Sequence, residues 1–482
     1  MDLSTPQPSV SVLFVAPECA PLTKTGGLGD VCGALPAALR RLGIDARVLL
    51  PGYSDVLAGI KAVELAKVEL LGVHGRLLGS KSGADEVPLL VLDCPALYAR
   101  QGGPYQSSEG EDWADNALRF AFLSKAAAVL GSERTPLHWK PDVVHCNDWP
   151  TALAPTYLRL ERTHRARSLL TIHNLAFQGN FDAGFMEQLR LPGSLFSIDG
   201  VEFHGKLSFL KAGIAHADAL STVSPTYARE IQTPDFGCGL EGLLRKRSAD
   251  LSGILNGIDV SAWDPASDAL IPQAYDAGSL EQKARNKEAL QRRMGLQVDA
   301  NVPLFGSVGR LTHQKGSDVL LAAADGLAAM GQLAVLGKGA REHESELRLL
   351  ALRHPGRVAA QVGFDEGLAH LIEAGADVFL MPSRFEPCGL NQLYSQRYGT
   401  PPVVRSTGGL ADTVQDGATG FVFDRLDPDT LLETAGRAVA AWRDQAGWRE
   451  IQRAAMARDF SWEAAARRYA DLYLRLATLE RA

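Results

Sequence analysis

The alternation of short β-branched runs with glycine-rich or polar loops and helical stretches constrains the fold of this chain more than any other feature. The first such unit has a β-branched run at 10–15, a glycine-rich segment at 25–30, a helical stretch near 31–42 and a second apolar run at 46–50. Repetition of this pattern is typical of βαβ units, which place parallel strands in one sheet with helices on its faces. The sequence therefore predicts an α/β fold built on parallel sheets.

The predicted strands fall into two series. The first continues through 89–92, 143–146, 169–172, 219–223 and 253–255, and the second runs through 304–308, 333–336, 358–362, 378–381, 403–404 and 421–423, after a polar, helix-rich stretch at 271–294. Two series predict two Rossmann-like, doubly wound parallel-sheet domains that face each other across a cleft. We place the N-terminal domain at 1–255 and the C-terminal domain at 256–460, followed by an amphipathic helix over 461–482 with Ser461 as its N-cap.

Composition excludes several classes of protein. Of the 482 residues, 46% are hydrophobic and 22% are charged, which is ordinary for a globular protein and unlike a disordered or collagenous chain. The 49 basic and 56 acidic residues give a net charge of −7. This charge offers no general attraction to nucleic acid or to an anionic membrane, so any phosphate-binding site has to be local.

The termini and the cysteines indicate the compartment. Asp2 stands where a secretory signal would carry Lys or Arg, and no run of about eighteen apolar residues occurs. The six cysteines lack CxxC spacing, so neither a disulfide framework nor a zinc site is indicated. We expect a soluble, cytoplasmic protein with reduced thiols.

Unusual polar side chains gather where the predicted strands end. Ligands of open parallel sheets bind at the carboxyl ends of the strands, so this placement indicates a binding site. The residues are Lys24, Gly26, Gly27 and Asp30 after the first strand; His145, Asn147, Asp148 and Trp149; His173 and Asn174; Arg310, His313, Gln314 and Lys315; Ser383, Arg384, Glu386 and Cys388; and Thr407, Gly408 and Gly409.

The segment from Gly309 to Gly316 is the sharpest of these elements. Arg310 and Lys315 lie on one predicted loop before a helix that begins near Ser317, so two cations and free N–H groups can converge on a diphosphate. The alternative is a pair of solvated loop cations. Gln314 stands where a Walker A loop needs Gly, and no G-x-G-x-x-G fingerprint follows any strand.

Three other groups complete the candidate site. The loop from Lys24 to Asp30 permits close backbone approach to a phosphate or sugar, and the similar run from Thr407 to Leu410 supplies backbone donors without a cation. Glu386 lies between strand and helix, where a carboxylate can accept two sugar hydroxyls. The alternative for each of these groups is that it belongs to an ordinary loop without a binding role.

A metal centre is not predicted. His145 and His173 occur singly on separate strands, without the i, i+4 helical spacing or the acidic pair that a metal site would need.

At these residues the chain resembles the bacterial glycogen synthase family, retaining glucosyltransferases that extend an α-1,4-glucan with ADP-glucose. The matching motifs occur in order and cover about 90% of the chain. They are Lys24–Val31, Asn147–Trp149, Thr171–Leu175, Thr222–Pro225, Ile254–Asp259, Gly309–Gly316, Arg384–Leu390 and Thr407–Leu410. The resemblance implies a GT-B fold, with the donor mainly on the C-terminal domain, the acceptor mainly on the N-terminal domain, and the last helix crossing back to the N-terminal domain.

The resemblance also implies roles for individual residues. Arg310 and Lys315 would hold the donor diphosphate, His173 would contact the transferred glucose, and Glu386 would bind its hydroxyls. The further donor-side residues that it implies are Lys24, Gly26, Gly27, Asn256, Lys287, Cys388, Gly389, Thr407, Gly408 and Gly409. Asp148 is implied as a catalytic residue, and the residues lining the sugar and acceptor region are Trp149, Asn174 and Tyr105.

One residue of this chain departs from the pattern of the broader superfamily. The broader superfamily carries E-x7-E, which would require a second Glu at position 394, whereas this chain has Tyr394. Tyr394 favours the starch and glycogen synthase branch over sucrose-type or lipid-sugar transferases. The resemblance implies ADP-glucose and glycogen as substrates, with no cofactor and no metal.

Other functions remain open from the residues. One is a related transferase that uses UDP-glucose or another acceptor. An NAD-dependent oxidoreductase on twin Rossmann domains is disfavoured by the missing G-x-G-x-x-G, and a non-catalytic glucan-binding relative is disfavoured by the complete set of Arg310, Lys315, Glu386 and His173.

Overall fold

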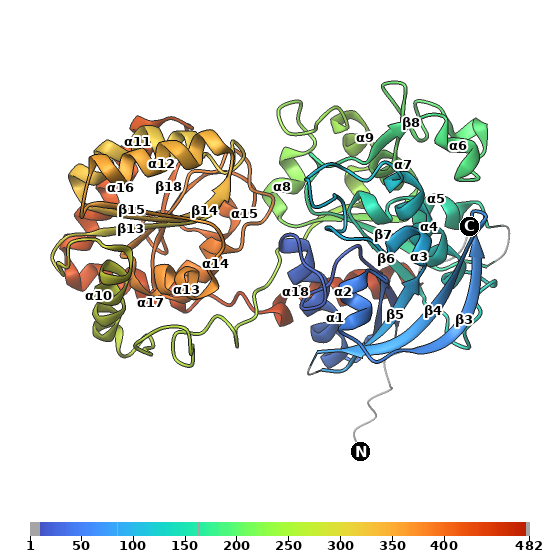
Figure 1. Cartoon of the computed structure of the whole chain (residues 1–482), viewed down its shortest axis with the longest axis horizontal. Coiled ribbons are helices and arrows are strands. Elements are labelled where there is room, and N and C mark those ends of the chain that lie inside the picture. The colour runs from blue at the N-terminus through green and yellow to red at the C-terminus, as the bar shows by residue number, and fades with distance from the viewer. Residues whose placement is uncertain (1–9, 84, 162–163, 479–482) are drawn as a thin grey trace, which may run out of the picture. The chain divides into compact units, whose positions relative to one another are not determined.

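The chain folds into two compact α/β units. The computed structural model describes residues 10–83, 85–161 and 164–478. Unit 1 comprises Met1–Val223, Ala228–Gly257 and Trp462–Ala482, and unit 2 comprises Ser224–Tyr227 and Ile258–Ser461 (Figure 1). Each unit contains its own parallel sheet, so the predicted class, an α/β protein with two parallel-sheet domains, is confirmed.

Unit 1 is built on a nine-stranded sheet in the order β12-β11-β7-β6-β1-β2-β5-β4-β3. Its strands are β1 (Ser11–Val15), β2 (Asp45–Pro51), β3 (Val63–Leu70), β4 (Val73–Ser82), β5 (Val87–Asp93), β6 (Val143–Asn147), β7 (Arg167–Ile172), β11 (Ala219–Thr222) and β12 (Leu251–Gly253). Pairing is parallel from β12 to β5, and β4 and β3 add an antiparallel edge. The chain leaves β1 toward β2 and later continues on its other side with β6, so the order reverses between β1 and β6.

Helices and short strands complete unit 1. The helices are α1 (Gly27–Arg41), α2 (Ser54–Ala58), α3 (Pro95–Tyr98), α4 (Asn116–Leu130), α5 (Leu153–Arg159), α6 (Phe185–Gln188), α7 (Phe209–His216), α9 (Glu241–Lys246) and α18 (Trp462–Thr478), with 3-10 turns at Trp149–Thr151, Gly193–Leu195 and Ser248–Asp250. A small antiparallel sheet pairs β8 (Asn180–Asp182), β10 (Lys206–Ser208) and β9 (Glu202–Phe203). The helix α8 (Pro225–Glu230) begins in the four residues that belong to unit 2.

The last helix belongs to unit 1. In α18 the buried residues recur at helical spacing, and the helix packs beside α1 (Figure 1). The hydroxyl of Tyr473 lies 2.7 Å from Nδ1 of the fully buried His145 on β6, which anchors the helix to the centre of the sheet. The amphipathic helix predicted over 461–482 is observed from Trp462 to Thr478, and residues 479–482 lie outside the described part of the chain.

Unit 2 is built on a six-stranded, wholly parallel sheet in the order β15-β14-β13-β16-β17-β18. Its strands are β13 (Leu304–Leu311), β14 (Gln332–Gly339), β15 (Val358–Val362), β16 (Val378–Met381), β17 (Pro402–Arg405) and β18 (Phe421–Phe423). Its helices are α10 (Lys283–Met294), α11 (Ser317–Met330), α12 (Arg341–Arg353), α13 (Glu366–Gly375), α14 (Asn391–Arg397), α15 (Gly408–Thr413), α16 (Pro428–Arg443) and α17 (Gln445–Met456), with a 3-10 turn at Leu280–Gln282. The strand order is that of a doubly wound fold and reverses between β13 and β16.

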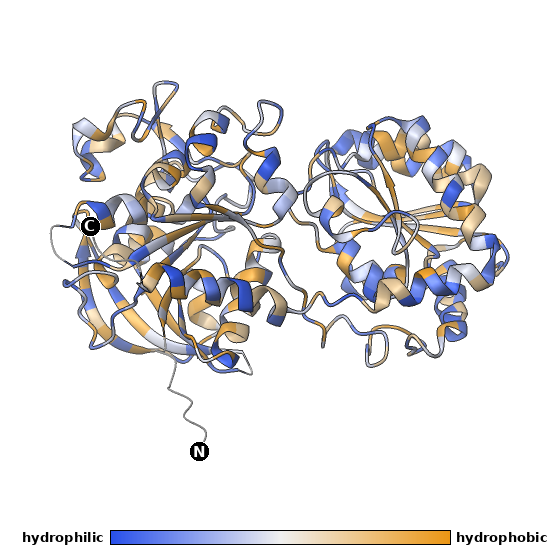
Figure 2. Ribbon diagram, turned by 180° about the vertical axis from the view of Figure 1, so that it is seen from behind, coloured by the Kyte–Doolittle hydropathy of each residue, from blue (hydrophilic) through white to orange (hydrophobic). Residues whose placement is uncertain are grey.

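Alternation along the strands of unit 2 produces a core on each face of its sheet. Phe305 and Val335 pack with α11 and α16, whereas Leu304 and Ala334 pack with α10 and α13. Successive strand side chains point to opposite faces, so strands covered on both sides are apolar throughout. Figure 2 shows this as largely hydrophobic strands surrounded by helices that carry both hydrophobic and hydrophilic residues.

Three boundaries differ from the sequence expectation. The helix expected near 31–42 begins at Gly27, and the strand expected at 304–308 extends to Leu311. The segment Ser224–Tyr227 joins unit 2, because Thr226 donates from its backbone N and its Oγ1 to the Asp412 carboxylate at 2.8 and 2.7 Å. Among the described residues, no helix combines the length and apolar character needed to span a bilayer.

Candidate active site

Three predicted site residues lie at the carboxyl ends of β13 and β16 in unit 2: the cations Arg310 and Lys315 and the carboxylate Glu386. β13 and β16 are neighbours in the sheet, at the position where the strand order reverses. Arg310 is the penultimate residue of β13, not a loop residue, and its exposed side chain has no ion-pair partner in the described ranges. Lys315 follows in the short loop before α11, and Glu386 lies in the loop after β16.

Lys315 and Glu386 form an ion pair. Nζ of Lys315 lies 2.5 Å from Oε2 of Glu386, and Oγ of Ser383 donates to the same oxygen at 3.0 Å. The Glu386 side chain is only 6% exposed, so these two contacts take the place of the water that its Oε2 would otherwise bind. Within the described chain both contacts are made to Oε2, which leaves Oε1 available to accept a hydrogen bond from a ligand.

Glycine permits the loops around Glu386 to pack closely. At Gly408, with φ of 45°, a Cβ would lie 1.9 Å from the carbonyl oxygen of Glu386, and at Gly316, with φ of 68°, it would lie 1.8 Å from that of Pro382. No other residue fits either position without displacing backbone. Gly389 follows Glu386 in the same loop, and Thr407 is the buried residue before α15.

The N–H of Gly409 is already in use. It donates to the carbonyl oxygens of Glu386 and Pro387 at 3.0 and 3.1 Å. A Cβ at Gly409 would also lie 2.1 Å from the carbonyl oxygen of Cys388. Gly409 therefore holds the Glu386 loop in place, and its predicted donor-binding role stays a prediction.

Phe364 is a candidate that sequence reasoning missed. It lies just beyond the carboxyl end of β15, so it is at the same ends of the strands as Lys315 and Glu386. Its side chain is 89% exposed. The N–H of the preceding Gly363 donates to the carbonyl oxygen of Gly337 at 3.0 Å, which fixes the start of this loop beside β14. An aromatic residue two positions after a predicted strand was the signal available in the sequence.

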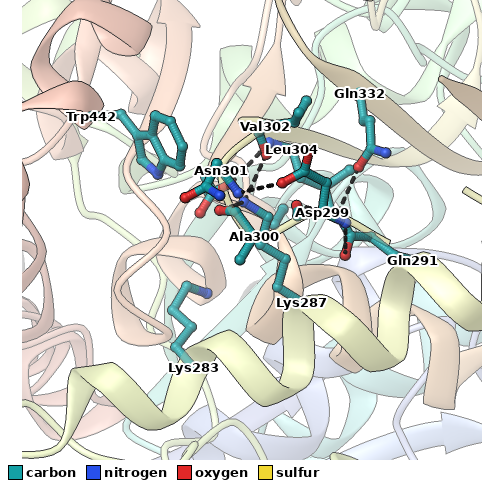
Figure 3. Close-up of polar contacts among 12 residues, drawn as sticks. Lys283, Lys287, Gln291, Asp299, Ala300, Asn301, Val302, Leu304, Gln332 and Trp442 are labelled. Atoms are coloured by element: carbon teal, nitrogen blue, oxygen red, sulfur yellow. Dashed lines mark hydrogen bonds and ion pairs between the residues drawn. The ribbon is translucent and has the colours of Figure 1, made fainter. Parts of the chain in front are cut away.

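Lys287 does not join the other predicted donor residues. It lies on α10, where its Nζ contacts the carbonyl oxygens of Ala300 and Val302 at 3.1 and 2.7 Å and the carboxylate of Asp377 at 2.7 Å (Figure 3). These partners precede β13 and β16, at the amino ends of the strands. The prediction for Lys287 is corrected, because its ammonium group is buried at the edge of the sheet opposite Lys315 and Glu386.

Unit 1 presents a second group of polar residues where its strand order reverses. Lys24 lies after β1 and pairs with Asp30 in the first turn of α1, with 2.7 Å between Nζ and Oδ1. The buried Glu18 accepts the N–H groups of Thr25 and Gly26 at 2.6 and 3.2 Å through Oε2. The glycine-rich loop, which runs through Gly26 into Gly27 at the helix start, is therefore fixed by a carboxylate that sequence reasoning missed.

Glu18 also joins this loop to the predicted sugar-lining aromatics. The Tyr105 hydroxyl donates to Oε1 of Glu18 at 2.7 Å, and burial raises the pKa of Tyr105, so the phenol keeps its proton. The Tyr105 ring lies 6.1 Å from that of Trp149, which in turn packs edge-on against Phe120 at 4.8 Å. The structure thus brings the predicted Tyr105 and Trp149 together on one wall.

Asp148 positions the residues after β7. Its Oδ1 accepts the N–H groups of His173 and Asn174 at 2.7 and 3.4 Å, and its backbone adopts a φ of 57°. Burial raises the pKa of Asp148 to about 7, an effect that the two N–H groups oppose. These contacts show that Asp148 positions the backbone of the loop after β7, and its predicted catalytic role stays a prediction.

His173 has a defined tautomer. Burial lowers its pKa to about 3, so the ring is neutral. Nδ2 of Asn147 donates to the carbonyl oxygen of Val15, so Oδ1 of Asn147 is the acceptor that lies 2.9 Å from Nε2 of His173. Nε2 therefore carries the proton, and Nδ1 presents a lone pair that can accept from a hydroxyl.

The remaining predicted groups lie apart from this cluster. Asn256 follows β12 at the edge of the unit 1 sheet. His145 bonds to Tyr473 and to Thr171 inside the core. Over residues 10–83, 85–161 and 164–478, no three His, Cys, Asp or Glu side chains come together as metal ligands.

Comparison with known proteins identifies the family. Residues 11–246 match the model of the starch synthase catalytic domain, and residues 291–454 match that of the group 1 glycosyl transferases. The chain is 52% identical to a glycogen synthase of Nitrosomonas eutropha, covering 98% of this chain and 97% of that protein. It is 53% identical to a glycogen synthase of Aromatoleum aromaticum, covering 96% of each.

Solved structures support the same fold. The catalytic domain of starch synthase IV from Arabidopsis thaliana, bound to ADP and acarbose, has a TM-score of 0.87 and 31% identity over 98% of this chain and all of that one. A sucrose-phosphate synthase from Thermosynechococcus elongatus, at 19% identity and a TM-score of 0.59 over 97% of this chain and 99% of that one, shares the fold. The chain therefore belongs to the glycogen synthase family and is a glycosyltransferase of the GT-B fold.

Proposed function

We propose that the protein transfers glucose from ADP-glucose to the non-reducing end of an α-1,4-glucan, with retention of configuration. One observation carries the donor side of this proposal: Arg310, Lys315 and the buried Glu386 gather where the strand order of unit 2 reverses. Doubly wound folds bind their ligands at this position. The similar starch synthase was solved with ADP and acarbose, which supports the same classes of ligand here.

The donor diphosphate is assigned to Arg310 and Lys315. Arg310 is exposed and without an ion-pair partner among the described residues, so it can bind two phosphate oxygens without first breaking a contact. Lys315 is held by Glu386 and retains two further N–H groups. Lys24 is proposed as an additional phosphate ligand, and the exposed ring of Phe364 as a surface on which the nucleobase stacks.

The transferred glucose is assigned to Glu386 and His173. Oε1 of Glu386 and Nδ1 of His173 are both acceptors, as sugar hydroxyls require. Cys388, Gly389, Thr407 and Gly408 are proposed to line the donor sugar from the loops around Glu386, and Asn256 is retained as a further donor residue. Trp149, Asn174 and Tyr105 are proposed to line the acceptor side.

Retention is proposed to proceed by displacement on one face of the sugar. A retaining glycosidase uses a second carboxylate about 5 Å from the first, but position 394 holds Tyr394, whose ring is stacked on Trp263 at 3.8 Å. We propose that the bond from the anomeric carbon to the diphosphate oxygen breaks as the acceptor hydroxyl bonds to that carbon from the same side. The hydroxyl proton then passes to the departing phosphate oxygen, while Arg310 and Lys315 stabilise its growing charge.

The test is to incubate the protein with glycogen and either ADP-glucose or UDP-glucose and to measure nucleotide release. We expect faster release of ADP than of UDP, and the new linkage should be α-1,4 by proton NMR. Release of UDP alone would favour the alternative, a related transferase with a different donor. Transfer to a sugar other than a glucan would likewise replace the proposed acceptor. The predicted cytoplasmic location remains a proposal that cell fractionation can test.

A further inference from the structure

The loop between β7 and β8 presents an aromatic ring that the proposed function does not use. Phe177 is 52% exposed and lies three residues after Asn174. An exposed ring forgoes the free energy of burial, although single exposed apolar residues are common on protein surfaces. Three features of this loop distinguish Phe177 from such a background.

The first feature is a rigid backbone around the ring. The N–H of Phe177 donates to the carbonyl oxygen of Asn174 at 3.2 Å. The carbonyl oxygens of Gln178 and Gly179 accept the N–H groups of Leu210 and Phe209 at 3.1 and 3.0 Å. The loop is thus held on both sides of Phe177, and a ligand that stacks on the ring pays little entropy for ordering it.

The second feature is continuity with the aromatic wall of unit 1. Gly179 has a φ of 61°, and a Cβ there would lie 2.3 Å from Cε3 of Trp149, so the loop rests directly on the Trp149 ring. Trp149 in turn neighbours Tyr105. The loop that carries Phe177 is therefore continuous with Trp149 and Tyr105, the two aromatics proposed to line the acceptor side.

The third feature is the absence of charge. The segment 174–180 contains no ionisable side chain and carries amides on both sides of the ring, at Asn174, Gln178 and Asn180. Nδ2 of Asn180 donates to Oε1 of Gln178 at 3.1 Å, and Nε2 of Gln178 donates to the carbonyl oxygen of Cys238 at 3.0 Å. A ring flanked by amides suits a neutral, polyhydroxylated ligand, whose apolar face stacks while its hydroxyls form hydrogen bonds.

We propose that Phe177 is a stacking platform for the glucan acceptor, which binds sugar units beyond the one that reacts. This inference rests on the proposed function for the identity of the glucan. Phe177 would increase the affinity for longer glucan chains, and it would take no part in the chemical step.

Two variants of the full chain test the platform. Phe177→Leu keeps an apolar side chain but removes the ring, and Phe177→Tyr keeps the ring. We expect Phe177→Leu to raise the KM for glycogen by about 3- to 10-fold, the range of an aromatic contact, with the KM for ADP-glucose and kcat at saturating glycogen unchanged. Phe177→Tyr should behave like the parent.

Acceptor length and direct binding provide independent readouts. In a series of maltooligosaccharides, the parent and Phe177→Leu should share one KM for short acceptors and diverge once the acceptor is long enough to reach the ring. In native gels containing glycogen, Phe177→Leu should be retarded less than the parent, a measurement that needs no donor. Val63→Ala is the control. Val63 is 69% exposed on β3, an edge strand that five other strands separate from β7.

The outcomes separate this inference from the proposed function. Equal retardation and equal acceptor KM in the parent and Phe177→Leu would overturn the platform, as would an equal rise in both KM values or a loss of kcat. If the parent released no ADP from ADP-glucose, the proposed donor would fail, and the gel measurement would still decide whether Phe177 binds glucan.

Discussion

The ion pair between Lys315 and Glu386 is the contact at residue scale on which the donor assignment depends. Lys315→Met removes the ammonium group and retains most of the aliphatic chain. We expect kcat to fall by about 100-fold or more, because a preorganised donor to the departing diphosphate is lost and Glu386 loses its partner. Steady-state kinetics with ADP-glucose and glycogen measure the effect.

The matched control is Lys67→Met, which removes an exposed lysine from the outer strand β3. It should leave kcat and both KM values within about 2-fold of the parent, as expected for a surface substitution away from the site. Turnover of Lys315→Met close to that of the parent would contradict the assignment of Lys315 to the diphosphate.

Asp148 should make stability depend on pH in a defined direction. Its pKa is raised from 3.8 to about 7 by burial, so the folded protein holds this proton more tightly than the unfolded chain. The free energy of unfolding therefore falls as the pH rises from about 4 to about 7, and it stays low above pH 7. Asp148→Asn cannot ionise and keeps an oxygen for the His173 N–H, so it removes this dependence.

Urea denaturation of the parent and Asp148→Asn at several pH values tests this. We expect the variant to gain about 4 kcal/mol relative to the parent between pH 4 and pH 8, from a shift of about three pKa units. His173 titrates in both proteins, so its contribution cancels in the difference. Asp471→Asn, on the exposed face of α18, is the control. A difference between Asp148→Asn and the parent that does not change with pH would show that Asp148 is not protonated in the folded state.

At the scale of elements, the sequence predicted the parallel strands and the starts of α11 and α18 well, but it missed the start of α1. Buried parallel strands are continuous apolar runs, so β6, β7 and β16 are visible from composition alone. The start of α1 was missed by four residues, because Gly26 and Gly27 were interpreted as a loop. The long-range contact from Glu18 that fixes this helix start has no local signature.

The antiparallel edge of unit 1 was also missed. β3 and β4 consist mainly of exposed and partly buried residues and carry Lys67 and Arg76, so they lack the apolar run by which the parallel strands were found. The position of Lys287 was beyond sequence reasoning for a different reason. Whether a helical lysine faces the carboxyl or the amino ends of the strands depends on how α10 packs, and here it ties the helix to Asp377.

At the scale of the whole molecule, the two units follow one plan. In each, the strand order reverses beside the first strand, between β1 and β6 in unit 1 and between β13 and β16 in unit 2. Polar residues gather at both reversals: Glu18, Asp148 and His173 in one unit and Lys315 and Glu386 in the other. The net charge of −7 gives no indication of these sites, because they comprise few of the 105 charged residues.

This plan predicts which segments each substrate class protects from hydrogen exchange. In the full chain, ADP should slow exchange of backbone amides in Gly309–Gly316 and in the loop after β16, because bound ligand suppresses local opening there. A long maltooligosaccharide should instead slow exchange in residues 174–180 of unit 1, where the loop rests on Trp149. Lys315→Met should lose the first protection and Phe177→Leu the second, each without affecting the other. Protection by ADP confined to unit 1 would contradict the assignment of the diphosphate to Arg310 and Lys315.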